Sequence, residues 1–297
     1  MALVYNPSTR TTSDIEGVTT RIPGAPPVGN VKDVEYLDTG LLMDFTAYYA
    51  LTAQKLVALG YKANVTLHGA PYDFRRAANE QQEYFTELRN LIQKNYETVR
   101  CFLVSNAIIF SKFKNNNTRV VLIAHSMGCT MSLYFLNQQT KAWKDKYIKS
   151  LVTLAGPWGG SAKSLEVVTV GTDLGFENIP IESEALKESI KFVERTQPSL
   201  TWMMPSSDIW PGDVLVKQEP NIEITTANLQ RYFKAIGVPN MVPMYQDTQA
   251  LLAGLPAPGV EVYYDGHRDN NDYLYRLSAS MELVLIQQSR LFTPRIP

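Results

Sequence analysis

The segment RVVLIAHSMGCTMSLYFL, residues 119–136, constrains the fold more than any other part of the sequence. In the stretch RVVLIA (119–124), every residue after Arg119 is apolar. A run without polar alternation is typical of a strand covered on both faces of a parallel sheet. Residues 128–139 fit a helix, and SLVTLA (150–155) fits the next strand. A strand, a helix and a strand in this order form a βαβ unit, so the sequence predicts an α/β fold with a mainly parallel sheet.

Segments on either side of this unit add further elements. Residues 41–60 predict a helix that Gly60 ends, and YKANVTL (61–67) predicts a strand followed by the loop HGAPYDFRR. A second helix is expected over residues 77–95, where apolar side chains recur at helical spacing. GVEVYY (259–264) predicts a further strand.

The chain is expected to form a single domain with a lid, because 297 residues suit one large α/β domain. Residues 41–156 would hold the core and the turn at residue 126. Residues 157–216 lose the alternation of strands and helices, so we interpret them as a lid or cap. Residues 217–264 are expected to return to the core, and residues 265–297 to form a tail.

Composition excludes several classes of function. A net charge of -1 without a basic run argues against binding to nucleic acid. The two cysteines, Cys101 and Cys129, and three histidines make neither a disulfide framework nor a metal site, so no metal and no cofactor is expected. The N-terminus lacks a signal pattern and no apolar run is long enough to span a bilayer, which by itself predicts a cytosolic protein.

The strand–turn–helix segment presents Ser126 as a candidate nucleophile. A serine on a sharp turn between a strand and a helix is exposed for attack, and small residues two positions before and after it, here Ala124 and Gly128, let the backbone bend. The backbone N–H of Met127 would then stabilise an oxyanion at the start of the helix. His125 must point away from the serine on such a turn, so we interpret it as a packing residue.

Three longer segments resemble a known family. HGAPYDFRRAANEQQEYFTELRNLI (68–92), VVLIAHSMGCTMSLYFLNQQTKAWKDKYIKSLVTLAGPWGGSAKSL (120–165) and PSLTWMMP (198–205) are similar to the lecithin:cholesterol acyltransferase family, particularly its lysosomal phospholipase A branch. The similarity runs from about Leu3 to about Tyr263. It implies an α/β-hydrolase fold with a mobile lid and a membrane-docking region.

The resemblance also implies a chemistry and a set of partners. Ser126 would attack a glycerophospholipid ester at a membrane surface and form an acyl-enzyme, from which water or a lipid alcohol would accept the acyl group. Trp158 is expected in the lid or against the substrate. Asn64 and Asn116 lie in glycosylation sequons, which fit the lysosomal or extracellular location that the family implies.

The sequence departs from the family pattern in three places. It is expected to begin downstream of the strand whose loop supplies the second oxyanion donor, and residues 100–111 form an apolar insert. The similarity ends after residue 264, before the acidic residue and the histidine of the family's triad. His267 is the only histidine that follows Ser126, with Asp265, Asp269 and Asp272 nearby, and we interpret it as part of a solvated polar loop.

These departures leave three functional hypotheses open. The first is a phospholipase and O-acyltransferase whose sequence is truncated at both ends and whose activity is impaired by the missing acid and base. The second is a catalytically inactive isoform that binds lipid or a partner. The third is a carboxylesterase of small soluble esters, which the lid-like segment and the 16 tyrosines and 4 tryptophans disfavour.

Overall fold

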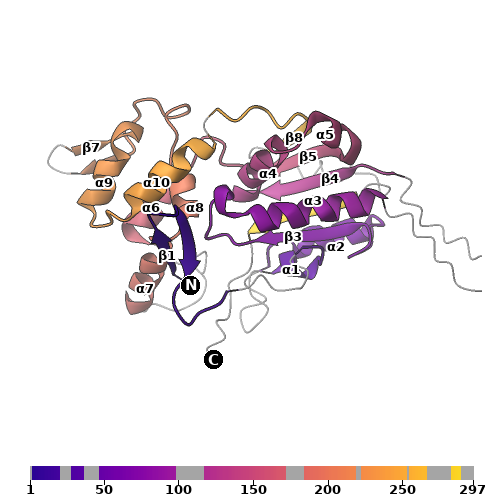
Figure 1. Cartoon of the computed structure of the whole chain (residues 1–297), viewed down its shortest axis with the longest axis horizontal. Helices are drawn as coiled ribbons and strands as arrows, with labels where there is room; N and C mark the ends of the chain where they lie inside the picture. The colour runs from indigo at the N-terminus through magenta and orange to yellow at the C-terminus, as the bar shows by residue number, and fades with distance from the viewer. Residues whose placement is uncertain are drawn as a thin grey trace, which may run out of the picture.

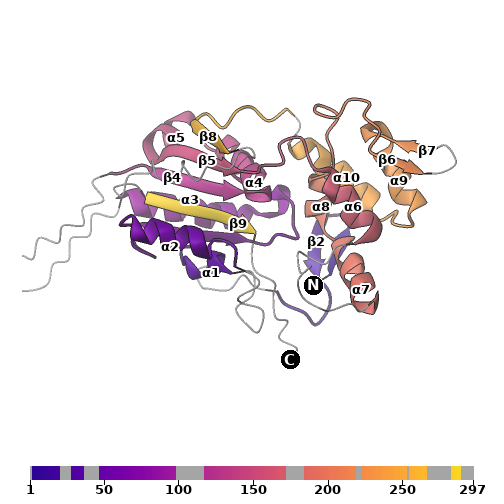
Figure 2. The same ribbon diagram turned by 180° about the vertical axis from the view of Figure 1, so that it is seen from behind.

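The computed structural model describes residues 2–20, 28–36, 47–97, 117–171, 184–218, 222–252, 254–265 and 282–288. These residues form two lobes, one around a parallel sheet and one of helices and short hairpins (Figures 1 and 2). The apolar insert at 100–111 and the part of the tail that contains His267 lie outside them.

The sheet lobe is built on five parallel strands. In spatial order they are β3 (Leu67–Tyr72), β9 (Glu282–Gln288), β4 (Val120–His125), β5 (Ile148–Leu154) and β8 (Glu261–Asp265). The α/β fold and the strands expected around residues 119–124, 150–155 and 259–264 are therefore confirmed. The tail supplies β9, a central strand of this sheet, which the sequence analysis did not predict.

Helices cover both faces of the sheet. They are α3 (Gln82–Glu97), α4 (Met127–Asn137) and α5 (Lys141–Tyr147) on one face, and α1 (Lys32–Glu35) and α2 (Ala50–Ala58) on the other. Alternate residues of β4 divide between two cores: Leu122 packs with α3 and α4, and Ile123 packs with the residues of α1 and α2. Burial on both faces explains why this strand reads as an unbroken apolar run.

Strand β3 lies later in the chain than the sequence predicted. Residues 62–66 form a turn around Asn64, which has a positive φ of 60°, and the strand is LHGAPY rather than YKANVTL. Gly69 is required because a Cβ there would lie 2.4 Å from the carbonyl oxygen of Asn30, in the segment that runs beside this edge of the sheet. Pro71 is tolerated near the end of an edge strand, where one side of the backbone needs no ladder partner.

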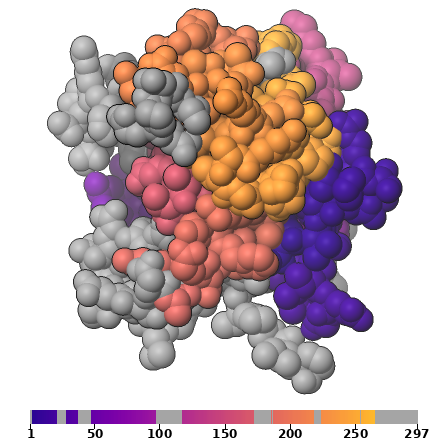
Figure 3. Space-filling model, turned by 90° about the vertical axis from the view of Figure 1, so that its left-hand side faces the viewer, coloured from indigo at the N-terminus to yellow at the C-terminus, as the bar shows by residue number. Residues whose placement is uncertain are grey.

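The second lobe combines helices with two hairpins. Its elements are β1 (Leu3–Asn6), β2 (Thr11–Asp14), α6 (Ala162–Val170), α7 (Glu184–Glu194), α8 (Pro198–Trp202), β6 (Val216–Gln218), β7 (Ile222–Ile224), α9 (Leu229–Ala235) and α10 (Met241–Thr248), with 3-10 turns at Thr226–Asn228 and Gln249–Leu251. Figure 3 shows the N-terminal hairpin (indigo) beside the orange and gold helices of this lobe. None of the helices described is both long and apolar enough to cross a membrane.

A separate hydrophobic core holds this lobe together. Leu165 of α6, Phe233 of α9 and Met241 of α10 belong to one buried cluster. Residues 222–248 therefore pack with the lid-like segment, although the sequence analysis placed them in the return to the core. The apolar faces of α9 and α10 are buried in the core that includes residues of α6 and α8. Of the expected return segment 217–264, only β8 therefore joins the sheet among the described residues.

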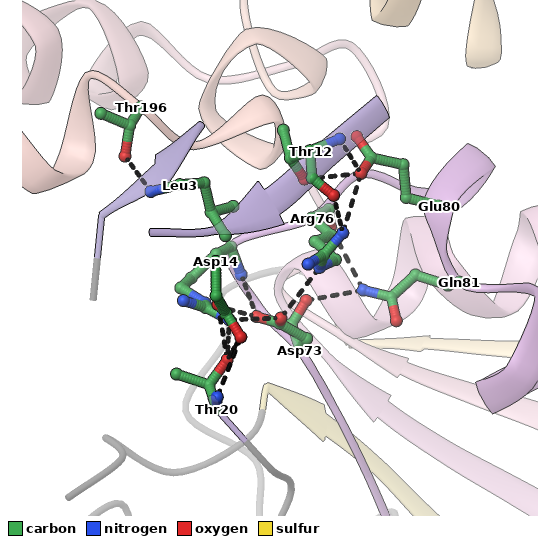
Figure 4. A network of polar contacts seen from close by, with 10 residues as sticks. Leu3, Thr12, Asp14, Thr20, Asp73, Arg76, Glu80, Gln81 and Thr196 are labelled. Carbon is green, nitrogen blue, oxygen red and sulfur yellow. Dashed lines mark hydrogen bonds and ion pairs between the residues drawn. The ribbon is translucent and has the colours of Figure 1, made fainter. Parts of the chain in front are cut away.

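A polar network that includes Asp14, Asp73 and Arg76 joins the two lobes (Figure 4). The buried guanidinium of Arg75 forms two hydrogen bonds to Asp73, at 2.9 and 2.8 Å, and contacts Asp14 of the N-terminal hairpin at 3.0 Å. The Arg75 carbonyl accepts a 3.1 Å bond from the Ser199 N–H in α8. The segment after β3 is thus bonded to two parts of the second lobe, the N-terminal hairpin and α8.

Candidate functional site

Ser126 occupies a strained turn at the carboxyl end of β4. Its backbone angles, φ 50° and ψ −128°, are rare for residues that carry a Cβ. The Ser126 N–H donates to the Leu154 carbonyl at 2.9 Å, and the Ser126 carbonyl accepts from the Cys129 N–H at 2.9 Å. The neighbouring strand β5 and the first turn of α4 therefore hold the serine in this conformation, which is the geometry of a nucleophile elbow.

The residues after Ser126 begin α4 and are almost fully buried. Met127 is 1% exposed, and its N–H belongs to the first turn of the helix, where backbone donors have no intrahelical acceptor. The Thr130 hydroxyl donates to the Met127 carbonyl at 2.8 Å, which fixes this peptide. A backbone N–H at the positive end of an eleven-residue helix suits the stabilisation of a developing negative charge.

His125 is turned toward Tyr48 and does not contact Ser126. Its Nδ1 is hydrogen-bonded to the Tyr48 hydroxyl, and the two rings meet edge-to-face with centroids 5.2 Å apart. Burial lowers the pKa of His125, which favours the neutral ring. These contacts agree with the prediction that His125 is a packing residue.

The other described histidine is also engaged away from the serine. Nδ1 of His68 lies 3.1 Å from the Gly29 carbonyl, and burial lowers the pKa of this ring. His267 lies outside the described residues, as do Asp269 and Asp272, so their place relative to Ser126 stays a prediction. The recorded ring contacts of the two described histidines are to Tyr48, Gly29 and Val65.

Cys129 is a buried packing residue on the first turn of α4. Its thiol contacts the Ala124 carbonyl at 3.3 Å, and burial raises the pKa of the thiol to about 12. A thiolate is therefore suppressed at neutral pH, which agrees with its interpretation as a filler. Within the part of the chain that is described, no group of three His, Cys, Asp or Glu side chains could hold a metal ion.

Trp158 lies close to the elbow, on the segment that follows β5. A Cβ added to Gly156 would lie 2.8 Å from the Trp158 ring and 2.9 Å from the Cβ of Cys129. The ring is half-buried against the core of the sheet lobe. Trp158 thus packs beside Gly156, close to the first turn of α4, and its contact with substrate stays a prediction.

The glycines after Trp158 join this edge to the helical lobe. The Gly159 carbonyl accepts a 2.9 Å bond from the Ser206 N–H and a 3.1 Å bond from the Trp210 indole. Gly160 has a φ of +79°, and a Cβ there would lie 2.1 Å from the Met204 carbonyl oxygen. Only glycine lets the two backbones approach so closely.

Gly160→Ala is therefore expected to destabilise the protein by more than about 2 kcal/mol, because it adds a backbone clash to the strain of a positive φ. Gly212→Ala is the matched control, since Gly212 has a φ of +77° and open space around the added Cβ. Its cost should be about 1 kcal/mol. Thermal or urea unfolding of both variants measures the difference, and equal losses would contradict the close packing at Gly160.

Asn64 is exposed at the turn before β3. Its side-chain oxygen accepts a 2.8 Å hydrogen bond from the Val31 N–H. This contact uses Oδ1 and not Nδ2, the atom to which an N-linked glycan attaches. Glycosylation at Asn64 stays a prediction, and Asn116 lies outside the described residues.

Two features of the site were not found by sequence reasoning. Ala155, directly after β5, has a positive φ of 50°, so two strained residues lie at the same edge of the sheet. Strand β9 ends beside the elbow, and the four consecutive apolar residues LVLI (283–286) were the signal that could have identified it.

Comparisons with known proteins place the sequence in a family. The family model described as lecithin:cholesterol acyltransferase matches residues 1–258. The chain is 35% identical to the lysosomal phospholipase A and acyltransferase of Rattus norvegicus, over 88% of this chain and 57% of that protein. It is 36% identical to the phosphatidylcholine-sterol acyltransferase of Gallus gallus, over 88% of this chain and 56% of that protein.

The two kinds of relative are almost equally similar, and the human phosphatidylcholine-sterol acyltransferase is also 36% identical, over 88% of this chain and 53% of that protein. The chain thus spans a little over half the length of the curated relatives it matches. The match of the family model over most of the chain, together with a parallel sheet and a serine elbow, shows that this protein belongs to the lecithin:cholesterol acyltransferase family.

Proposed function

We propose that this protein is a lipid acyl hydrolase and O-acyltransferase that acts on glycerophospholipid esters through a Ser126 acyl-enzyme. The observation that carries the proposal is the strained backbone of Ser126 between β4 and α4, with the Met127 N–H at the helix start. The names of the relatives, phospholipase A and acyltransferase among them, support the class of reaction.

The proposed reaction has two steps. The Ser126 hydroxyl oxygen bonds to the ester carbonyl carbon, the carbonyl oxygen becomes an oxyanion, and hydroxide takes the serine proton and becomes water. The oxyanion then collapses, the bond to the glycerol oxygen breaks, and that oxygen takes a proton from water, which restores hydroxide, and leaves as the lysophospholipid alcohol. Water or a lipid alcohol repeats the sequence on the acyl-enzyme, which releases a fatty acid or a new ester and restores the serine.

Exposed apolar side chains of the lid segment support a lipid rather than a small soluble ester. Ile209 is 60% exposed and packs on Gly159, which follows Trp158 in the chain, and Phe192 on α7 is 66% exposed. Apolar side chains of this size favour contact with a membrane surface or an acyl chain over contact with water. We infer that phospholipid in a bilayer is the substrate and that residues 157–216 serve as the lid.

The turnover of this polypeptide is proposed to be low. His68 and His125 are both engaged away from Ser126, and we propose that His267 does not act as a base either. Without a positioned base, only binding and oxyanion stabilisation accelerate the attack. The alternative is an inactive isoform that binds lipid or a partner. The contacts that hold His68 and His125 away from Ser126 favour it as well.

The proposal that no base is positioned beside Ser126 predicts a specific pH profile. The rate at which a fluorophosphonate modifies Ser126 is expected to rise steadily from pH 6 to pH 10, because hydroxide takes the serine proton. A positioned histidine would instead give a plateau above about pH 7. A plateau that disappears in His267→Ala would contradict the proposal and identify the base.

Hydrolysis of phosphatidylcholine vesicles tests the proposed function directly. We expect slow release of fatty acid by the full chain, and faster release of acyl product when a lipid alcohol is present. Vesicle binding without any Ser126-dependent product would favour the inactive isoform. Faster cleavage of a short soluble ester than of vesicle phospholipid would favour the carboxylesterase.

We also propose a lysosomal or extracellular location, with Asn64 and Asn116 as glycosylation sites. The name of the lysosomal phospholipase A and acyltransferase supports the location. The comparisons do not support the cytosolic alternative.

A further inference from the structure

His125 ends β4 and is held from the face of the sheet that α1 and α2 cover. Alternate side chains of a strand point to one face, so His125 shares its face with Val121 and Ile123. Those two residues belong to the core cluster that also contains residues of α1 and α2, and Tyr48 packs against the same cluster. The Tyr48 ring meets His125 edge-to-face, and its hydroxyl is hydrogen-bonded to Nδ1 of His125. The residue directly before the nucleophile therefore has a side-chain anchor of its own.

Tyr48 has neighbours that fix its position independently of His125. It lies two residues before α2, and its N–H donates to the Glu35 carbonyl at 2.8 Å. The N–H of Tyr49 donates to the Val34 carbonyl at 3.3 Å, and the rings of Tyr48 and Tyr49 meet edge-to-face with centroids 5.3 Å apart. Helices α1 and α2, which lie side by side, thus set the place of the phenol (Figure 2).

The strained turn needs restraint on both sides of Ser126. After the serine, the first turn of α4 restrains it through the bond from the Cys129 N–H to the Ser126 carbonyl. Before the serine, a return of φ from 50° to the ordinary negative range must rotate the peptide that joins His125 to Ser126. A rare backbone conformation persists only where its surroundings hold it. The anchor on His125 resists this rotation, together with the bond from the Ser126 N–H to the Leu154 carbonyl.

We propose that Tyr48 is a positioning residue for Ser126: its hydroxyl donates to Nδ1 of His125 and so stabilises the strained turn that presents the nucleophile. This inference rests on the proposed function. It assigns His125 the neutral tautomer with its hydrogen on Nε2, because Nδ1 must then accept. Burial supports a neutral ring, since it lowers the pKa of His125.

Tyr48→Phe keeps the ring and removes only the hydroxyl. One net hydrogen bond shifts an equilibrium about fivefold, so the limiting rate at which a long-chain fluorophosphonate modifies Ser126 should fall by about that factor. The probe concentration that gives half of the limiting rate should not change, because the alkyl chain of the probe binds before the serine oxygen reacts.

Tyr84→Phe is the matched control for the loss of a buried tyrosine hydroxyl. The Tyr84 hydroxyl donates to the Ala70 carbonyl at 3.3 Å, on β3, which does not adjoin β4. Its thermal midpoint should fall about as far as that of Tyr48→Phe, while Ser126 should react at the native rate. The comparison separates a slower reaction from a loss of stability.

Changes at His125 separate the hydrogen bond from the bulk of the side chain. His125→Asn places an amide oxygen at the same point along the side chain as Nδ1, so Tyr48 can still donate and most of the native rate should remain. His125→Leu offers no acceptor and should slow the modification about as much as Tyr48→Phe. The double variant Tyr48→Phe with His125→Leu should be no slower than either single variant, because both changes remove the same bond.

The tautomer of His125 reports the bond directly. The protein has three histidines, so NMR of isotope-labelled imidazole nitrogens resolves few signals, and the one that His125→Asn removes belongs to His125. The native chain should show the Nε2–H tautomer, and Tyr48→Phe a mixture of the two tautomers. A role of the tyrosine in packing alone would leave the tautomer unchanged.

A native limiting rate in Tyr48→Phe, equal slowing by Tyr84→Phe, or an Nδ1–H tautomer of His125 in the native chain would overturn the inference. His125→Asn that reacts as slowly as His125→Leu would overturn it as well. If Ser126 of the native chain does not react at all, the proposed function itself fails, so the two failures are distinguishable.

Discussion

Ser126→Ala is expected to abolish acyl transfer from phospholipid, with a loss of about 10³-fold or more relative to the native chain. The oxygen that forms the covalent bond is removed, and only water at the oxyanion donors could then attack the ester. Replacing a catalytic serine costs up to about 10⁶-fold in an enzyme with an intact triad. We expect a smaller loss here because the native rate is proposed to be low. Fatty acid release from phosphatidylcholine vesicles measures it.

Two further variants separate the loss of the hydroxyl from a change in stability. Ser126→Gly removes the same hydroxyl but relieves the strain of a φ of 50°, so it should be about 1 kcal/mol more stable than Ser126→Ala and equally inactive. Ser189→Ala, at an exposed serine on α7, should retain full activity. Activity retained in either Ser126 variant would exclude this serine as the nucleophile.

Arg75→Met is expected to lower the free energy of unfolding by about 3–5 kcal/mol. The Arg75 side chain is 1% exposed and pairs with both Asp73 and Asp14, so its loss removes the buried positive charge that the two carboxylates share. The same change should weaken the attachment of the N-terminal hairpin, which Asp14 ends. Urea unfolding measures the stability, and limited proteolysis of the hairpin measures the attachment.

Lys141→Met is the matched control for a charge removed from the surface. The pair of Lys141 and Asp145 has a length of 2.6 Å, but its side chains are 84% and 55% exposed. Its removal should cost no more than about 1 kcal/mol. Equal losses in the two variants would contradict the importance of burial at Arg75.

The pH dependence of stability provides a second check on this network. Burial alone would raise the pKa of Asp14, but hydrogen bonds from Thr20 and the charge of Arg75 outweigh it and lower the pKa below its ordinary value of 3.8. A lowered pKa in the folded state means that this stability is present above about pH 4 and is lost as the pH falls through the folded pKa. Asp14→Asn should therefore flatten the acid side of the stability curve.

The elbow could be predicted from sequence because its determinants are local. A buried strand, a serine between Ala124 and Gly128, and an apolar helix all fall within one segment of the chain. The turn also sets the direction of His125, so its packing role followed without knowledge of Tyr48. Each of these features depends on neighbours a few residues away.

Features that depend on distant partners were misplaced or missed. Strand β3 was read as a loop because His68, Gly69 and Pro71 are poor strand formers, and their place makes sense only beside the segment around Asn30. Strand β9 was missed because its two neighbours, β3 and β4, lie far before it in the chain. Burial of α9 against a second core likewise depends on contacts that no local pattern shows.

The most direct test of the account is to look for the acyl group on Ser126. The full chain is incubated with phosphatidylcholine vesicles that carry an isotopically labelled acyl chain, quenched in acid and digested with trypsin. We expect a labelled acyl ester on the peptide 120–141, located at Ser126 and absent from Ser126→Ala. Release of labelled fatty acid without that adduct in rapidly quenched samples, or an adduct at another residue, would contradict it.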